Sequence, residues 1–180
     1  MLFDYNECRK RFSSPYQIEK AVEDCRIYKM MPGVYSDTGA ESELEVLQAR
    51  YPKSVLTLET AYQYYNLTDV ISDVYTFATP RNAPRIKDER IKQYYVPGEV
   101  FGVGMTTAEF EGEKLRIYDR ERLLIETVRM KERLPLDLYR EVINSFRKVR
   151  EDLYAAKIGD YLEGFGRKEG FMKIIEAEVF

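Results

Sequence analysis

Acidic side chains are the groups in this sequence best suited to chemistry. They gather with one lysine in the set Glu111, Glu113, Lys114, Asp119, Glu121 and Glu126. A metal-dependent nuclease uses two or three converging acids to hold Mg²⁺, often beside a lysine. The spacing does not fix such a convergence, and Asp119 and Glu121 are also placed to cap a helix and to fill its positive first turn. The structural role is favoured, so we expect no metal site, no cofactor and no enzyme activity.

The sequence contains no histidine among its 180 residues. This removes histidine general bases, Ser-His and Cys-His nucleophile pairs and nearly all zinc sites. The two cysteines, Cys8 and Cys25, cannot hold a structural zinc alone and are too few for a disulfide framework. An enzyme built on this chain would have to rely on carboxylates, lysines or tyrosines.

Composition indicates a water-soluble protein with room for a core. Hydrophobic residues make up 44% and charged residues 33%, with a net charge of −3. No stretch approaches the roughly 18 apolar residues that a membrane helix needs. The opening MLFDYNECRKRF is too polar for a signal peptide. We therefore expect a cytoplasmic protein with reduced thiols and no membrane partner.

The elements that must position these residues centre on the stretch 115–149. Leu115 to Tyr118 alternates like a half-buried strand, Asp119 is placed to cap the helix that follows, and Leu134-Pro135 ends it. A second amphipathic helix begins near Asp137. Each element has one apolar side, so strand and helices should close on a common core.

The amino-terminal residues have the order of a winged helix-turn-helix module. A short helix over Asp4–Phe12 precedes a strong helix start at Ser14-Pro15, and Pro32-Gly33 predicts a tight turn between two strands. Only three residues precede Asp4, so the first helix of a three-helix core is missing. An ordinary amphipathic helix that packs on a larger domain explains the second helix equally well.

If this module binds DNA, its lysines and arginines would hold phosphates while Gln17 or Tyr16 reaches base edges. The candidate DNA-binding residues are Arg9, Lys10, Arg11, Ser14, Tyr16, Gln17 and Lys20. Residues 1–36 carry six basic and five acidic side chains, which favours neither alternative.

A second basic stretch lies farther along the chain. Its candidate interaction surface comprises Arg81, Arg85, Lys87 and Arg90. A solvated loop is the more ordinary explanation of such a charge run. Strands are expected over Val74–Thr79, Lys92–Val96 and Val100–Val103.

Three segments resemble the AbiEi family, the antitoxins of type IV toxin–antitoxin systems related to phage abortive infection. They are YDRERLLIETVRMKERLPLDLYREVINSF from Tyr118, RIYKMMPGVY from Arg26, and KSVLTLETAYQYYNLTD from Lys53. In the last, Thr57, Ala61, Leu67, Thr68 and Asp69 match a Ser/Thr-initiated helix with a central Ala and a Leu-Thr-Asp ending. The resemblance covers roughly residues 15–149.

The resemblance implies an α+β protein with a small winged helix-turn-helix-like module at residues 1–38 and a mixed α/β antitoxin domain at residues 39–180. It also implies two roles, namely repression of its own operon through operator DNA and neutralisation of a cognate nucleotidyltransferase-like toxin, by direct contact or otherwise. The alternative is a stand-alone winged-helix transcriptional regulator without a toxin partner.

Overall fold

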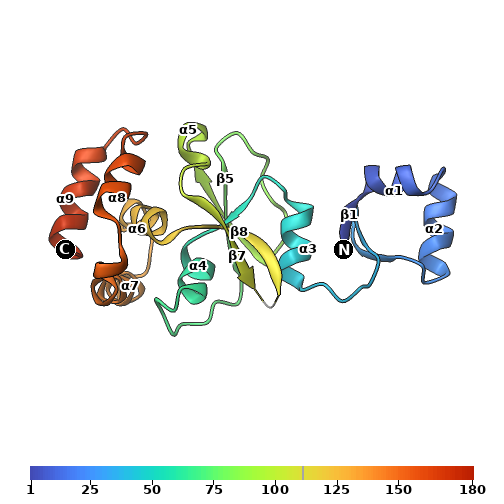
Figure 1. The fold of residues 1–180 in the computed structure, drawn as a ribbon, viewed down its shortest axis with the longest axis horizontal. Coiled ribbons are helices and arrows are strands. Elements are labelled where there is room, and N and C mark those ends of the chain that lie inside the picture. The colour runs from blue at the N-terminus through green and yellow to red at the C-terminus, as the bar shows by residue number, and fades with distance from the viewer. Residues whose placement is uncertain (111) are drawn as a thin grey trace. The chain divides into compact units, whose positions relative to one another are not determined.

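The computed structural model describes residues 1–110 and 112–180 and divides them into two compact units (Figure 1). Unit 1 comprises Met1–Pro52 and Glu109–Leu115, and unit 2 comprises Lys53–Ala108 and Arg116–Phe180. Both contain helices and strands, so the predicted α+β class is confirmed. Unit 1 extends beyond residue 38, since it also includes residues 39–52 and the helix Glu43–Arg50 within them.

Unit 1 is built from three helices and a three-stranded sheet among its described residues. In chain order these are β1 (Leu2–Asp4), α1 (Tyr5–Arg11), α2 (Pro15–Glu23), β2 (Tyr28–Met31), β3 (Val34–Ser36) and α3 (Glu43–Arg50). The sheet is antiparallel with the order β1-β3-β2. All three residues of β3 are buried, as expected for a central strand covered on both faces.

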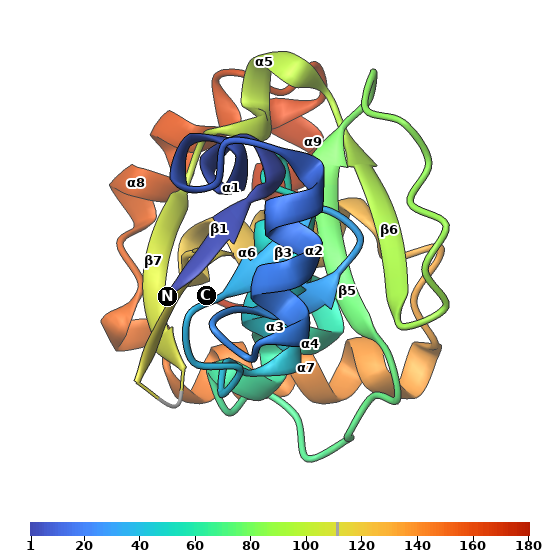
Figure 2. The same ribbon diagram turned by 90° about the vertical axis from the view of Figure 1, so that its right-hand side faces the viewer.

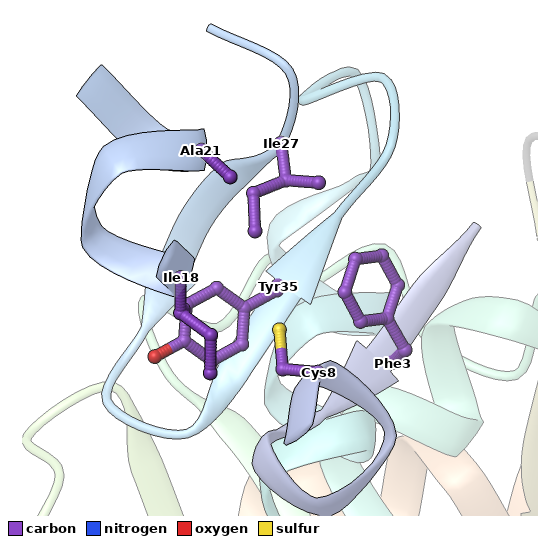
Figure 3. Close-up of a cluster of buried hydrophobic side chains, with 6 residues drawn as sticks. All are labelled: Phe3, Cys8, Ile18, Ala21, Ile27 and Tyr35. Atoms are coloured by element: carbon purple, nitrogen blue, oxygen red, sulfur yellow. The ribbon is translucent and has the colours of Figure 1, made fainter. Parts of the chain in front are cut away.

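Helices cover the two faces of this sheet (Figure 1). On one side α1 and α2 close over a cluster of Phe3, Cys8, Ile18, Ala21, Ile27 and Tyr35, drawn in Figure 3. On the other, α3 contacts all three strands, and its Leu44 and Leu47 side chains are buried. The third helix of unit 1 thus follows the hairpin instead of preceding Asp4, and it lies on the other face of the sheet from α1 and α2.

Local signals in the sequence explain where the helices of unit 1 begin. Asp4 and Glu7 form a reciprocal capping box at α1, which the sequence analysis did not anticipate. The hydroxyl of Ser14 accepts a hydrogen bond from the Gln17 amide at 3.2 Å, with Pro15 in the first turn, as predicted. The predicted turn after β2 places Gly33 at φ +82°, a conformation that favours glycine.

Unit 2 contains a five-stranded sheet and a group of helices. Its elements are β4 (Val55–Leu56), α4 (Leu58–Tyr64), β5 (Tyr75–Pro80), β6 (Ile91–Val96), α5 (Gly98–Phe101), β7 (Met105–Phe110), β8 (Glu113–Tyr118), α6 (Arg120–Arg129), α7 (Leu136–Lys148), a 3-10 turn (Arg150–Asp152), α8 (Ala155–Leu162) and α9 (Lys168–Glu178). Strands β7 and β8 each extend into the segment 109–115 that belongs to unit 1. The sheet order is β6-β5-β4-β8-β7.

The sheet of unit 2 is mixed. Strand β5 runs parallel to β6 and antiparallel to β4, which in turn runs parallel to β8. Figure 2 shows β5 and β6 side by side, with β6 at the edge of the sheet. A ten-residue loop, 81–90, makes the parallel connection between them.

Helix α6 is the buried centre of the helical group, because every residue from Glu121 to Val128 is buried. It contacts α4, α8 and α9. Asp119 caps it as predicted, accepting a hydrogen bond from the Arg122 amide at 2.9 Å. The strand expected over Val100–Val103 is wrong: this segment is the end of α5 and a turn, whose carbonyls face the Arg122 guanidinium. Nowhere in the described residues is a helix both long and apolar enough to cross a membrane.

Candidate nucleic-acid interface

The seven predicted DNA-binding residues all lie on α1, on α2 or between them, in unit 1. Six are exposed, and Ser14 is half-buried. On α2 the buried side chains Ile18 and Ala21 face the core, so Tyr16 and Lys20, four residues apart, share the outward face. Tyr16 is 71% exposed, an unusual position for a tyrosine in a unit with its own core.

Three of the seven side chains are already engaged in holding unit 1 together. The Ser14 hydroxyl caps α2, and the Gln17 side-chain oxygen accepts a hydrogen bond from the Ser13 amide at 2.9 Å. The Arg11 guanidinium pairs with Asp37 at 2.8 Å and stacks over the Phe3 ring at 3.9 Å. If Gln17 contacts a base, its side-chain nitrogen is therefore the group that does so. The role of Arg11 is principally structural.

The remaining four form the candidate interface: Arg9, Lys10, Tyr16 and Lys20. Within the described residues, none of the three cations has an ion-pair partner. They sit at the end of α1 and the outer face of α2, where a backbone phosphate could approach each from solvent. Glu19 and Glu23 on the same helix limit the positive charge, so the face is weakly rather than strongly basic.

The second predicted surface lies in unit 2, on the loop 81–90 between β5 and β6. The Arg90 guanidinium donates two hydrogen bonds to Asp88, at 2.9 and 2.7 Å, and these bonds lower the pKa of the Asp88 carboxyl. Arg90 is therefore part of the loop's own structure. Arg81, Arg85 and Lys87 remain exposed.

The side chain of Gln93 on β6 holds this basic loop in place. Its oxygen accepts a hydrogen bond from the Ile86 amide at 2.8 Å, and its nitrogen donates to the Thr79 hydroxyl at 2.8 Å and the Pro84 carbonyl at 3.1 Å. An open hollow of about 540 Å³ lies against residues 85–91. The loop is thus an ordered surface, although Asp88 and Glu89 line the hollow beside the cations.

Three of the candidate carboxylates, Asp119, Glu121 and Glu126, are paired with cations. Lys157 bridges Asp119 and Glu121 at 3.1 and 3.0 Å, and Tyr161 donates to Asp119 at 2.8 Å. Burial lowers the pKa of the Lys157 ammonium, but hydrogen bonds to the two carboxylates more than offset this, so its pKa is raised. The lysine is a fixed cation that neutralises both acids.

Glu126 is neutralised by two arginines. Arg122 and Arg129 pair with its two oxygens, and the Arg122 side chain is fully buried. No group of acids, cysteines or histidines among the described residues could hold a metal ion. Glu111 and the side chain of Glu113 lie outside the part that the structure describes.

Sequence reasoning missed β1, and its boundary at residue 38 assigned the segment of α3 to the second domain, whereas α3 belongs to unit 1. A three-residue strand such as Leu2–Asp4 has too little periodicity to be identified, although the Asp4-x-x-Glu7 spacing of a capping box marks where it ends.

Known protein families and curated proteins offer no match to this chain.

Proposed function

We propose that the chain is an antitoxin of the type IV AbiEi kind, a cytoplasmic protein that represses its own operon and neutralises a nucleotidyltransferase-like toxin. The observation that supports repression is the exposed face of α1 and α2, which presents three cations and Tyr16. This face belongs to unit 1, which has its own hydrophobic core. The resemblance over residues 15–149 supports the second role.

Operator binding by unit 1 would be weak and sensitive to salt, because few phosphates can be reached. Three contacts, from Arg9, Lys10 and Lys20, give a slope of about −2.7 in log K against log salt, so raising salt from about 50 to 200 mM weakens binding about 40-fold. Anisotropy titration with a labelled promoter fragment measures this slope. Binding that is tight and indifferent to salt would exclude the proposed interface.

The two roles should separate along the chain. Replacing Lys10 and Lys20 with alanine removes two phosphate contacts and spares the buried face of α2, so repression of a promoter–reporter should fall while rescue from the co-expressed toxin persists. The control is Lys148→Ala with Lys173→Ala, two exposed lysines of unit 2. If the Lys10/Lys20 variant folds but loses both activities together, the separation is refuted.

The loop 81–90 is the proposed surface for the second role. Reversing Arg81 and Arg85 to glutamate should weaken growth rescue and leave promoter binding intact, with Lys148 and Lys173 reversed as the charge-matched control. Equal rescue by both double variants would exclude this loop.

The second candidate function is a stand-alone transcriptional regulator, and the observation that supports it is the exposed α1–α2 face, which would suffice for DNA binding without a toxin partner. A neighbouring reading frame for a nucleotidyltransferase-like protein, with growth rescue on co-expression, would decide for the antitoxin. Promoter binding without rescue would decide for the regulator.

A further inference from the structure

Two adjacent aliphatic side chains, Val70 and Ile71, project from unit 2 into solvent. They lie in the loop 66–74 between α4 and β5, and Ile71 is 86% and Val70 53% exposed. Single exposed apolar residues are ordinary, but a pair of neighbouring branched side chains on one loop keeps apolar area in water that burial would stabilise. The contacts of the surrounding loop indicate why the two side chains are kept exposed.

The loop that carries this pair is held by side chains from two helices. The Glu141 carboxylate of α7 accepts hydrogen bonds from the Thr68 hydroxyl at 2.9 Å and the Asp69 amide at 3.1 Å. The Gln63 side-chain nitrogen of α4 donates to the Val70 carbonyl at 2.9 Å. These bonds fix the backbone from Thr68 to Val70, directly before Ile71, which reduces the ordering entropy that a partner would have to offset on binding.

Carboxylates lie beside the aliphatic pair in the sequence and on α7, the helix that holds the loop. Asp69 and Asp73, both exposed, flank it in the sequence. On α7, exposed Asp137 occupies the position one helical turn before Glu141, the residue that holds the loop. An apolar tip with an acidic border is complementary to an apolar pocket with a basic border.

We propose that the Val70–Ile71 tip is a docking surface for a partner protein that receives it in an apolar pocket bordered by lysine or arginine side chains. The ordered loop presents Ile71 as the anchor, and the flanking aspartates set orientation. The inference rests on the proposed function only for the partner's identity, which would then be the toxin.

The test places a benzophenone amino acid at position 71 of the full chain, expressed in its native cells, and a matched probe at exposed position 173 on α9. Irradiation should give an adduct at position 71 and not at 173, and mass spectrometry identifies the protein in it. That protein, purified, is then titrated calorimetrically against wild type, Ile71→Leu and Ile71→Asp. Affinity should stay within about threefold for leucine and fall at least tenfold for aspartate.

Each result decides the proposal. It is overturned by the absence of an adduct beyond that at position 173, by an adduct between two copies of this chain, or by equal affinity of wild type and the folded Ile71→Asp variant. An adduct with a protein other than a nucleotidyltransferase-like toxin, weakened by Ile71→Asp, supports the docking surface and refutes the toxin in the proposed function. Growth rescue without an adduct refutes the docking surface alone.

Discussion

Replacing Arg122 with alanine should destabilise unit 2 more than any other single charge removal in α6. The side chain is fully buried, and its guanidinium donates to the Val100 carbonyl at 2.6 Å, the Val103 carbonyl at 3.0 Å and the Glu126 carboxylate at 2.8 and 3.1 Å. It also lies against the rings of Tyr118 and Phe165. One side chain thus ties α5 and the turn after it to α6.

The expected loss in free energy of unfolding follows from these contacts. Breaking a buried ion pair costs about 3–5 kcal/mol when the remaining charge is left alone. Here Glu126 keeps Arg129, which lowers that cost, but two carbonyls lose their donor at about 1–3 kcal/mol each when buried. Because these contributions overlap, we expect a total of about 4 kcal/mol.

The matched control is Arg129→Ala on the same helix. The Arg129 side chain is 19% exposed and pairs with the other Glu126 oxygen, so its loss should cost about 1–2 kcal/mol. Urea denaturation followed by far-ultraviolet circular dichroism gives both values. Hydrogen exchange of the α6 amides measures the stability of unit 2 separately from that of unit 1. An Arg122→Ala variant within about 1 kcal/mol of wild type would refute the reasoning.

Three further predictions test the cores and one titrating group. Phe146→Ala should cost about 3–5 kcal/mol because the ring is fully buried; a melting temperature near wild type would contradict it. Gly104→Ala should lower the urea midpoint, since φ is +71° and the added Cβ would lie 2.3 Å from the Arg122 Cβ; an unchanged midpoint would disprove the close approach. Burial raises the pKa of the Glu41 carboxyl, but hydrogen bonds, first from the Met1 ammonium, lower it from 4.5 to about 2. The contribution of the Glu41 carboxylate to the free energy of unfolding should be complete above pH 4.5 and disappear as the pH falls towards 2. The difference in urea midpoint between wild type and Glu41→Gln should therefore shrink over that window, and a constant difference would contradict this.

Signals carried by a few adjacent residues were sufficient to predict many local elements. Ser14-Pro15, Asp119 and Pro32-Gly33 identify two helix starts and a turn from capping and backbone preference alone. Asn66 adopts the left-handed conformation expected after α4, with φ +55°. These features depend on neighbours in sequence, so no knowledge of the tertiary fold was needed.

Elements that depend on distant partners could not be predicted in the same way. The run Val100 to Val103 has the composition of a strand, yet the carbonyls of Val100 and Val103 accept hydrogen bonds from Arg122, which lies 22 and 19 residues farther along the chain. Thr57 precedes α4 as predicted, but its hydroxyl makes no cap hydrogen bond, and the Leu58 backbone after it takes φ +38°. Tertiary contacts overrode local propensity at both places.

The same distinction governs where function can reside in this chain. Acids and cations in unit 2 that might have formed a site pair with one another: Glu126 with Arg122 in the interior, and Asp119 with the partly exposed Lys157. Chemistry on a substrate would need at least one of them free to bind or to exchange a proton. The proposed contacts instead depend on exposed side chains, namely the cations on α1 and α2, those on the loop 81–90, and the Val70–Ile71 pair.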